Sequence, residues 1–233
     1  MQQIDKQGGF TLIELLIVTI LLSLLMFTGT YAYSLFTNKW QSELGHFNQS
    51  NLQAMGFVHL QKILANISPY VIRTDNNQPA FFFIGGNDSL LAITHDGLFS
   101  DNSAEAFRLS SVKAADGTYQ LLYQARSLAN MTILNESQSV EFSDEIVLVD
   151  RLDKIQFRYF GWSSYGDKQS QSADNLVGEI KWYDVFSGID KQLTPEKIVL
   201  ELSQGDKHIP ITVNLDHQAE RWLRSYFDET QSD

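Results

Sequence analysis

Apolar residues dominate the start of the chain, in the run GFTLIELLIVTILLSLLMF from Gly9 to Phe27. About 20 apolar residues in a helix, rising about 1.5 Å each, are enough to cross the hydrocarbon of a bilayer. The run therefore predicts a membrane-spanning helix. It contains one acid, Glu14, and a charge at the centre of a bilayer costs about 2.5–3.5 kcal/mol on insertion scales. Because such acids are rare without a role, we expect Glu14 to be functional.

A second helical pattern follows the apolar run. Apolar positions recur there at spacings of three and four residues, as expected for one face of a helix: Leu52, Gly56, Leu60, Ile63 and Ile67. The first proline is Pro69, which disfavours helical geometry at Ser68. The sequence predicts one helix from Thr11 to Ile67, with residues 10–36 in the membrane and residues 37–68 as its amphipathic continuation.

From Gln78 onward the pattern changes to short runs of aromatic and β-branched residues between turn residues. The predicted strands are Ala80–Ile84, Leu90–Thr94, Phe107–Ser111, Thr118–Tyr123, Ile146–Val149, Ile155–Phe160, Glu179–Tyr183, Ile198–Leu202 and Ile209–Asn214. Turn residues at 85–88, 116–117, 187–188 and 204–206 predict hairpins. We expect a polar loop over 163–175 and a short helix within 217–233 that covers a sheet edge. The fold class is α+β, a long amino-terminal helix packed on a mostly antiparallel β domain over residues 69–233.

Composition and charge reduce the number of function classes that fit the chain. Apolar residues make up 43% of the 233-residue chain, which is enough for a core and unlike a disordered chain. The formal net charge of −11 argues against nucleic-acid binding, which needs clustered Lys and Arg. The absence of cysteine excludes disulfides and Cys-ligated metals.

The first residues, MQQIDKQGG followed by FTLIEL, resemble the class III signal of type IV prepilins and type II secretion pseudopilins. The resemblance implies that residues 1–9 are a leader peptide, that a prepilin peptidase cuts after Gly9, and that the new amino group of Phe10 is methylated. The conserved glutamate of that family falls on Glu14. A neighbouring subunit's Glu14 would then neutralise the Phe10 amine inside a filament, which sets the stagger between subunits.

The later segments FFFIGGNDSLLAIT, DKIQFRYFGW, GEIKWYDVF and LTPEKIVLELS are similar to the J-type pseudopilin and related minor pilins. This resemblance implies a minor subunit that primes or caps a type IV pilus or a type II secretion pseudopilus. Its partners would be the prepilin peptidase, other minor pilins or pseudopilins, a major pilin and an inner-membrane assembly platform. The amino terminus would be cytoplasmic and the β domain periplasmic.

Three other interpretations stay open. An ordinary secretory signal would be cleaved near the small residues Thr30 and Ala32, but it would not carry an acid in its apolar region. A plain single-span anchor would merely tolerate Glu14. The chain could also be an anchored periplasmic binding protein or enzyme that does not polymerise.

We expect no catalytic residue, metal or cofactor. The histidines show no HExxH spacing, and the sequence GWSSYG at 161–166 lacks the GxSxG pattern of serine hydrolases. The segment Asp75–Asn77 and the pair Asp167 and Asp174 are candidate calcium ligands, although neither forms an EF-hand loop. Exposed tryptophans often dominate interfaces. The candidates are Trp40, Trp162, Trp182 and Trp222; Trp182 is expected in the core, whereas Trp162 is open between core and interface.

Overall fold

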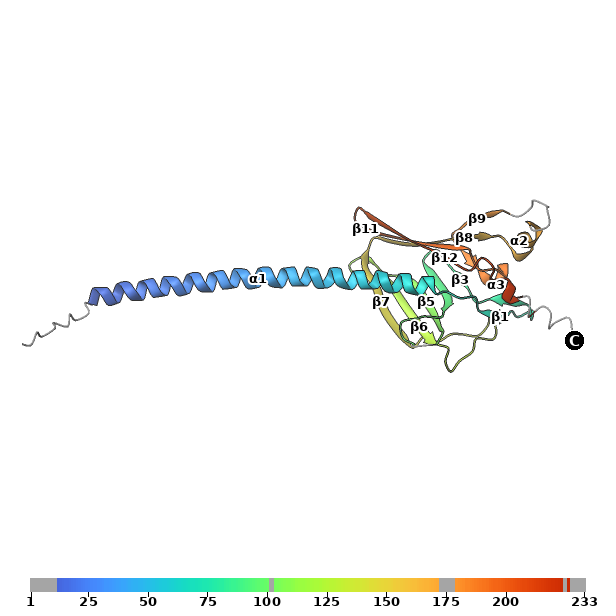
Figure 1. Cartoon of the computed structure of the whole chain (residues 1–233), viewed down its shortest axis with the longest axis horizontal. Helices are drawn as coiled ribbons and strands as arrows, with labels where there is room; N and C mark the ends of the chain where they lie inside the picture. Colours follow the sequence, from blue (N-terminus) through green and yellow to red (C-terminus); the bar gives the residue numbers. More distant parts are fainter. Residues whose placement is uncertain (1–11, 101–102, 172–178, 224–225, 227–233) are drawn as a thin grey trace, which may run out of the picture. The chain divides into compact units, whose positions relative to one another are not determined.

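The computed structural model describes residues 12–100, 103–171, 179–223 and 226, without the side chains of residues 37–52, 170 and 171. The chain divides into two compact units, Met1–Leu52 and Gln53–Asp233. Helix α1 spans Leu12–Ala65 and contributes to both units. The second unit, which we call the head, contains the strands (Figure 1).

The described residues of the head form three antiparallel sheets. Its strands are β1 (Val71–Arg73), β2 (Pro79–Phe81), β3 (Ile84–Gly85), β4 (Ser89–Thr94), β5 (Glu105–Lys113), β6 (Tyr119–Ser127), β7 (Asp144–Leu152), β8 (Lys154–Trp162), β9 (Ile180–Tyr183), β10 (Phe186–Ser187), β11 (Lys197–Gln204) and β12 (Lys207–Asn214). The six-stranded sheet has the order β10-β3-β4-β5-β6-β7 and the four-stranded sheet the order β12-β11-β8-β9. β1 and β2 form a separate pair. These observations confirm the α+β fold class.

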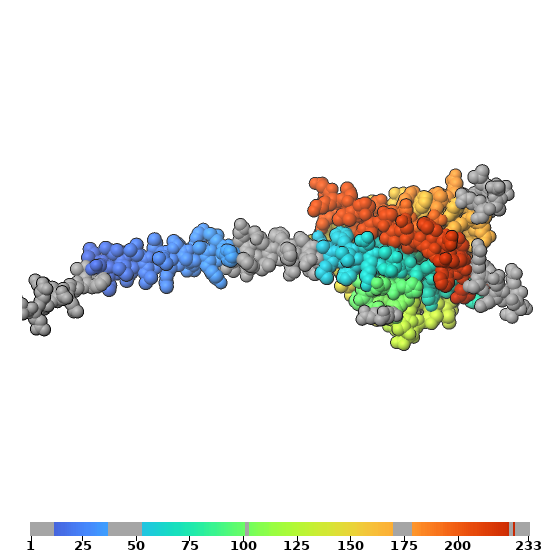
Figure 2. Space-filling view, viewed as in Figure 1, coloured from blue at the N-terminus to red at the C-terminus, as the bar shows by residue number. Residues whose placement is uncertain are grey.

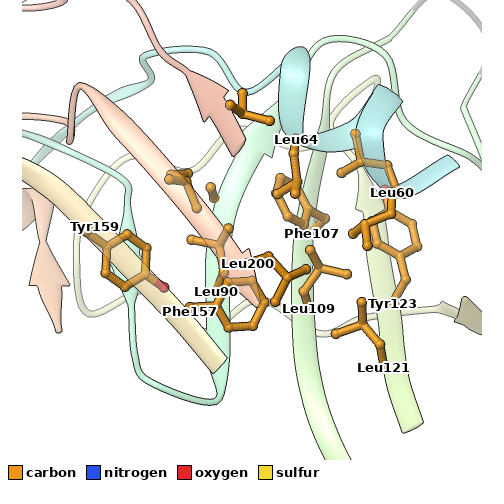
Figure 3. Close-up of a cluster of buried hydrophobic side chains, with 14 of the residues drawn as sticks. Leu60, Leu64, Leu90, Phe107, Leu109, Leu121, Tyr123, Phe157, Tyr159 and Leu200 are labelled. Carbon is orange, nitrogen blue, oxygen red and sulfur yellow. The ribbon is translucent and has the colours of Figure 1, made fainter. Parts of the chain in front are cut away.

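The main core lies between the two larger sheets (Figure 3). Phe107 and Leu121 enter it from the six-stranded sheet, and Phe157 and Leu200 enter it from the four-stranded sheet. Along β8 and β11, buried and partly exposed residues alternate, as expected for strands with one face on a core. Burying apolar side chains of this size stabilises the fold by about 1.5–3 kcal/mol each.

The last three turns of α1 complete this core. Leu60, Ile63 and Leu64 are fully buried there, and Gly56 is buried against β7. The buried residues follow the three-and-four spacing of the sequence. Figure 2 shows the other side of this helical segment at the surface of the head, between residues of the two larger sheets. The helix therefore contributes one face to the core and leaves the other exposed.

The four-stranded sheet ends in an unusual outer strand. β12 pairs with β11 along its whole length, and Pro210 stands opposite Glu201 in the middle of this pairing. Proline has no N–H to donate, so it is tolerated on an outer strand and not in the centre of a sheet. Gly205, at a φ of 56°, makes the turn between the two strands, as the residues QGD at 204–206 predict.

Several predicted strand boundaries differ from the structure. The expected strand Ala80–Ile84 is instead β2 and β3, because Phe81, Phe82 and Phe83 are all buried, in three different apolar clusters. A strand that is buried on one face only would alternate. The short strands β1 and β10 were not predicted, since two or three residues are too few to show a period.

One predicted hairpin turn and part of one predicted loop are wrong. The expected hairpin turn at 187–188 is the start of helix α3 (Gly188–Lys191), where the Ser187 hydroxyl accepts a hydrogen bond from the Asp190 N–H at 3.1 Å. Part of the expected loop 163–175 is helix α2 (Tyr165–Gln171), because the Ser164 hydroxyl accepts from the Asp167 N–H at 3.2 Å. In both cases a serine caps a helix rather than marking a turn.

The tryptophans and the carboxy-terminal segment are the last features to compare with the predictions from sequence. Trp182 is 42% exposed on β9, so the prediction of a core position is wrong. Trp162 is buried, and its indole N–H donates to Glu196 Oε1 at 2.9 Å. Residues 221–223 form a helical turn, and Leu223 packs with Phe81 in a small apolar cluster. The side chain of Trp40 lies outside the described residues.

Candidate assembly site in the amino-terminal helix

The segment Leu12–Phe36 of α1 is long and apolar enough to cross a membrane, and none of it is buried within the protein. Leu, Ile, Val, Met and Phe side chains cover its surface and are more than half exposed. A contiguous apolar surface of this size is not stable in water, so it must be covered by lipid or by other protein. The segment is therefore either an anchor, an assembly surface, or both in turn.

Four hydroxyl groups of this segment are satisfied within the helix itself. Thr19 donates to the Leu16 carbonyl at 2.9 Å, and Ser23 donates to the Thr19 carbonyl at 2.8 Å. Thr28 and Thr30 donate to carbonyls three or four residues before them in the same way. An unsatisfied polar group costs several kcal/mol in an apolar medium, and these bonds remove that cost.

Glu14 is the one acidic residue of the apolar segment Leu12–Phe36. It lies in the first turn of α1 and is exposed there, beside Leu12, Ile13 and Leu15. The positive end of the helix dipole favours an acid at this position. Gly9 and Phe10, the predicted cleavage and methylation positions, lie outside the described residues.

In the head, a buried acid holds a loop to the six-stranded sheet. Glu105 on β5 is fully buried and accepts hydrogen bonds from the Phe99 N–H (2.9 Å), the Leu98 N–H (3.2 Å) and the Tyr123 hydroxyl (2.7 Å). Burial, and next the hydrogen bond to Glu105, raise the pKa of Tyr123. Gly97 lies against this carboxylate so closely that a Cβ there would be 1.9 Å from Oε2. The sequence alone does not reveal Glu105, because a single acid in a strand adds nothing to the alternation of apolar and polar positions.

A second polar cluster joins α2 to the carboxy-terminal segment. Lys168 Nζ lies 3.0 Å from Glu220 Oε2 and 3.8 Å from Glu196 Oε1, and all three side chains are about one-fifth exposed. Lys168 also donates to the His217 carbonyl. The cluster comes from three segments that are far apart in sequence, which is why spacing alone does not reveal it. Its charged groups pair with one another.

One candidate calcium ligand, Asp167, is hydrogen-bonded to neighbouring serines. Asp167 binds the Ser163 and Ser164 hydroxyl groups, and the Ser163 bond, followed by the Ser164 bond, lowers the pKa of Asp167. Its proposed companion Asp174 lies outside the described residues. Among the residues that the structure describes, no three His, Asp or Glu side chains gather where they would hold a metal ion.

Comparison with known families agrees with the geometry of the amino-terminal helix. Residues 4–29 match the model of the prokaryotic N-terminal methylation motif. No curated protein matches the chain. The amino-terminal region is therefore similar to the class III signal of type IV pilins. Together with the apolar helix, this motif indicates membrane anchoring.

Proposed function

We propose that this chain is a minor pilin or pseudopilin that assembles into a type IV pilus or a type II secretion pseudopilus. The observation that carries the proposal is the methylation motif at residues 4–29 in front of an apolar helix that the protein itself leaves uncovered. The head supports it, because residues 53–223 bury a core of their own. Residues 1–9 are then the leader, and Phe10 is the methylated first residue of the mature chain.

Glu14 is proposed as the charge that fixes the position of a subunit in the filament. Cleavage after Gly9 creates an amine on Phe10, which is cationic, and Glu14 of a neighbouring subunit supplies the opposite charge. Two opposite charges attract far more strongly in an apolar surrounding than in water, although removing them from water costs much of this gain. A pair of this kind favours one register over others that leave a buried charge unmatched.

The place of the subunit follows from the resemblance of the head to the J-type pseudopilin and related minor pilins. We propose a priming or capping role beside other minor subunits and a major pilin, after synthesis in the inner membrane with the amino terminus in the cytoplasm. The prepilin peptidase and the inner-membrane assembly platform are then its first partners. The work of the chain is mechanical and structural, without catalysis.

The amino terminus of the mature chain tests the proposal. Protein purified from cells with an active prepilin peptidase should begin at Phe10 and carry one added methyl group, as read by mass spectrometry. Protein from cells without the peptidase should begin at Met1. Gly9→Val should block cleavage, whereas Gly8→Ala is the matched control that should leave it intact. A mature chain that begins at Met1, or beyond Ala32, in peptidase-positive cells would exclude the proposal and favour an anchored protein or a secreted one.

A further inference from the structure

Two pockets adjoin on the head around β1. One has a volume of about 500 Å³ and is lined by aromatic and aliphatic residues that include Tyr70 and Trp222. The other, of about 340 Å³, is lined by polar residues that include Asn77 and Asn135. Arg73 and Leu134 line both pockets, and we call the two together the β1 cleft. Volumes of about 300–1,000 Å³ are typical of sites for small ligands.

Main-chain hydrogen bonds fix the walls of the β1 cleft. β1 pairs with β2, and on its other side the Arg73 N–H donates to the Leu134 carbonyl (2.9 Å) and the Glu136 N–H donates to the Arg73 carbonyl (3.1 Å). Arg73 Nη1 donates to Asn77 Oδ1 at 3.3 Å. The Asp75 N–H donates to Glu136 Oε1 at 2.9 Å. A site held in this way needs little reorganisation to bind a ligand.

The larger pocket offers aromatic surface to solvent. Trp222 is 53% exposed and Tyr226 is 37% exposed, and both line this pocket together with Tyr70. Aromatic side chains have flat apolar faces and, in Trp and Tyr, a polar edge. They suit a ligand that is itself apolar on one face and polar at its rim.

The smaller pocket offers both hydrogen-bond donors and acceptors. Arg73 supplies N–H donors, the amides of Asn77 and Asn135 supply both kinds of group, and Asp75 supplies acceptors. The charge of Arg73 is offset by Asp75, and Glu136 adjoins them through its bond to the Asp75 N–H. The chain as a whole carries −11. This balance disfavours phosphates, nucleic acids and acidic sugars, and it favours an uncharged ligand.

We propose that the β1 cleft binds a neutral oligosaccharide. A pyranose ring has apolar C–H faces, which fit Trp222 and Tyr226, and hydroxyl groups that both donate and accept, which fit the polar residues of the smaller pocket. A hydroxyl group can pair with a guanidinium, a carboxylate or an amide, so one ligand class satisfies every group in the wall. The proposal concerns the head alone and does not depend on the role in a filament.

Binding is tested on the full chain in phospholipid nanodiscs, since maltoside detergents would present sugars of their own. Isothermal titration calorimetry uses maltohexaose, cellohexaose and chitohexaose as neutral probes and sialyllactose as the acidic one. We expect saturable heat with at least one neutral probe and none with sialyllactose. Trp222→Ala should weaken the binding by about tenfold or more, because it removes the stacking surface.

Two further variants make the result specific. Asn135→Ala removes one amide from the polar pocket and should also weaken binding, so the proposal does not rest on the fold of the Trp222 variant. Trp182→Ala is the matched control, because Trp182 is also exposed but lines neither pocket. Thermal unfolding establishes that each variant is folded. The proposal is overturned if no neutral probe binds, if only sialyllactose binds, or if Trp222→Ala and Asn135→Ala bind as well as Trp182→Ala.

Discussion

Gly56 on α1 lies directly against the main chain of β7, where a Cβ would come within 1.8 Å of the Leu148 carbonyl oxygen. A backbone atom in a paired strand cannot move away as a flexible side chain can. Gly56→Ala should therefore destabilise the head by about 3 kcal/mol, at the upper end of the usual cost of overpacking. Urea unfolding of the full chain, followed by tryptophan fluorescence, measures the loss.

Gly166 is the matched control for Gly56. It is also a helical glycine, in α2, but the nearest atom to a Cβ there is the Ser164 hydroxyl oxygen at 3.8 Å. Gly166→Ala should be neutral or stabilise the head by up to about 1 kcal/mol, because alanine has the higher helix propensity. Equal effects of the two substitutions would contradict the close contact at Gly56.

Tyr123→Phe should destabilise the head by about 1.5–3 kcal/mol, the usual value for a hydrogen bond to a charged group. The change removes the 2.7 Å bond to Glu105 and leaves the acid with the Leu98 and Phe99 N–H groups. Tyr119→Phe, on the same strand, is the control and should cost less. Hydrogen exchange at Leu98 and Phe99 provides a second measurement: both amides should exchange faster in the Tyr123 variant alone.

Tyr159 should make the stability of the head fall at alkaline pH. Burial raises the pKa of its hydroxyl above the ordinary value of 10, and that hydroxyl donates to the Gly86 carbonyl at 2.9 Å. The folded state therefore disfavours the ionised form, so the contribution is complete below about pH 10 and is lost as the pH rises beyond it. Tyr159→Phe should give a lower free energy of unfolding at neutral pH and a shallower decline above pH 10. A decline as steep as in the parent protein would refute this origin.

Lys168→Met should destabilise the head by roughly 1–3 kcal/mol, between the values for exposed and buried ion pairs. It leaves Glu196 and Glu220, both about one-fifth exposed, without their shared cation. Lys62→Met is the comparison, because its pair with Asp96 is 2.8 Å long but about half exposed and should contribute less than about 1 kcal/mol. Thermal unfolding should rank the two in this order, and the reverse order would contradict the burial argument.

Glu14→Ala should leave membrane insertion intact and abolish incorporation into filaments, since it removes the proposed counter-charge of the Phe10 amine. Insertion is measured by resistance to alkaline extraction, and incorporation by the amount in sheared filaments. Thr19→Ala is the control in the same helix, because its hydroxyl bonds only the Leu16 carbonyl of its own helix. Normal incorporation of the Glu14 variant would end the proposed role.

The sequence predicts well the elements in which a regular spacing of apolar residues continues over many positions. The buried face at Gly56, Leu60 and Ile63 follows helical spacing, and β8 and β11 lie close to their predicted positions. Serine was misread twice, at Ser164 and Ser187, because the same hydroxyl group favours turns and caps helices. Trp182 was misplaced because β9 is an outer strand of its sheet, which only the strand order reveals.

Among the candidate sites, some can be found from the sequence and others only from the structure. Glu14 is visible in the sequence because an acid contrasts with an apolar run. The cluster around Lys168 and the β1 cleft each join segments from distant parts of the chain, and Glu105 bonds a loop and the neighbouring strand. Strand register and loop packing decide these contacts, and neither is encoded in local spacing.

Pro210 has a consequence for heads that crowd together. An outer strand with a full row of free N–H groups invites a strand from another molecule, which is how sheets fuse into aggregates. In β12, Pro210 lacks an N–H and so interrupts that row at its middle, and Lys207 and His208 lie at one end of the strand. Neighbouring heads at very high local concentration are therefore kept from joining their sheets through β12, so that any ordered growth must run through other surfaces of the molecule.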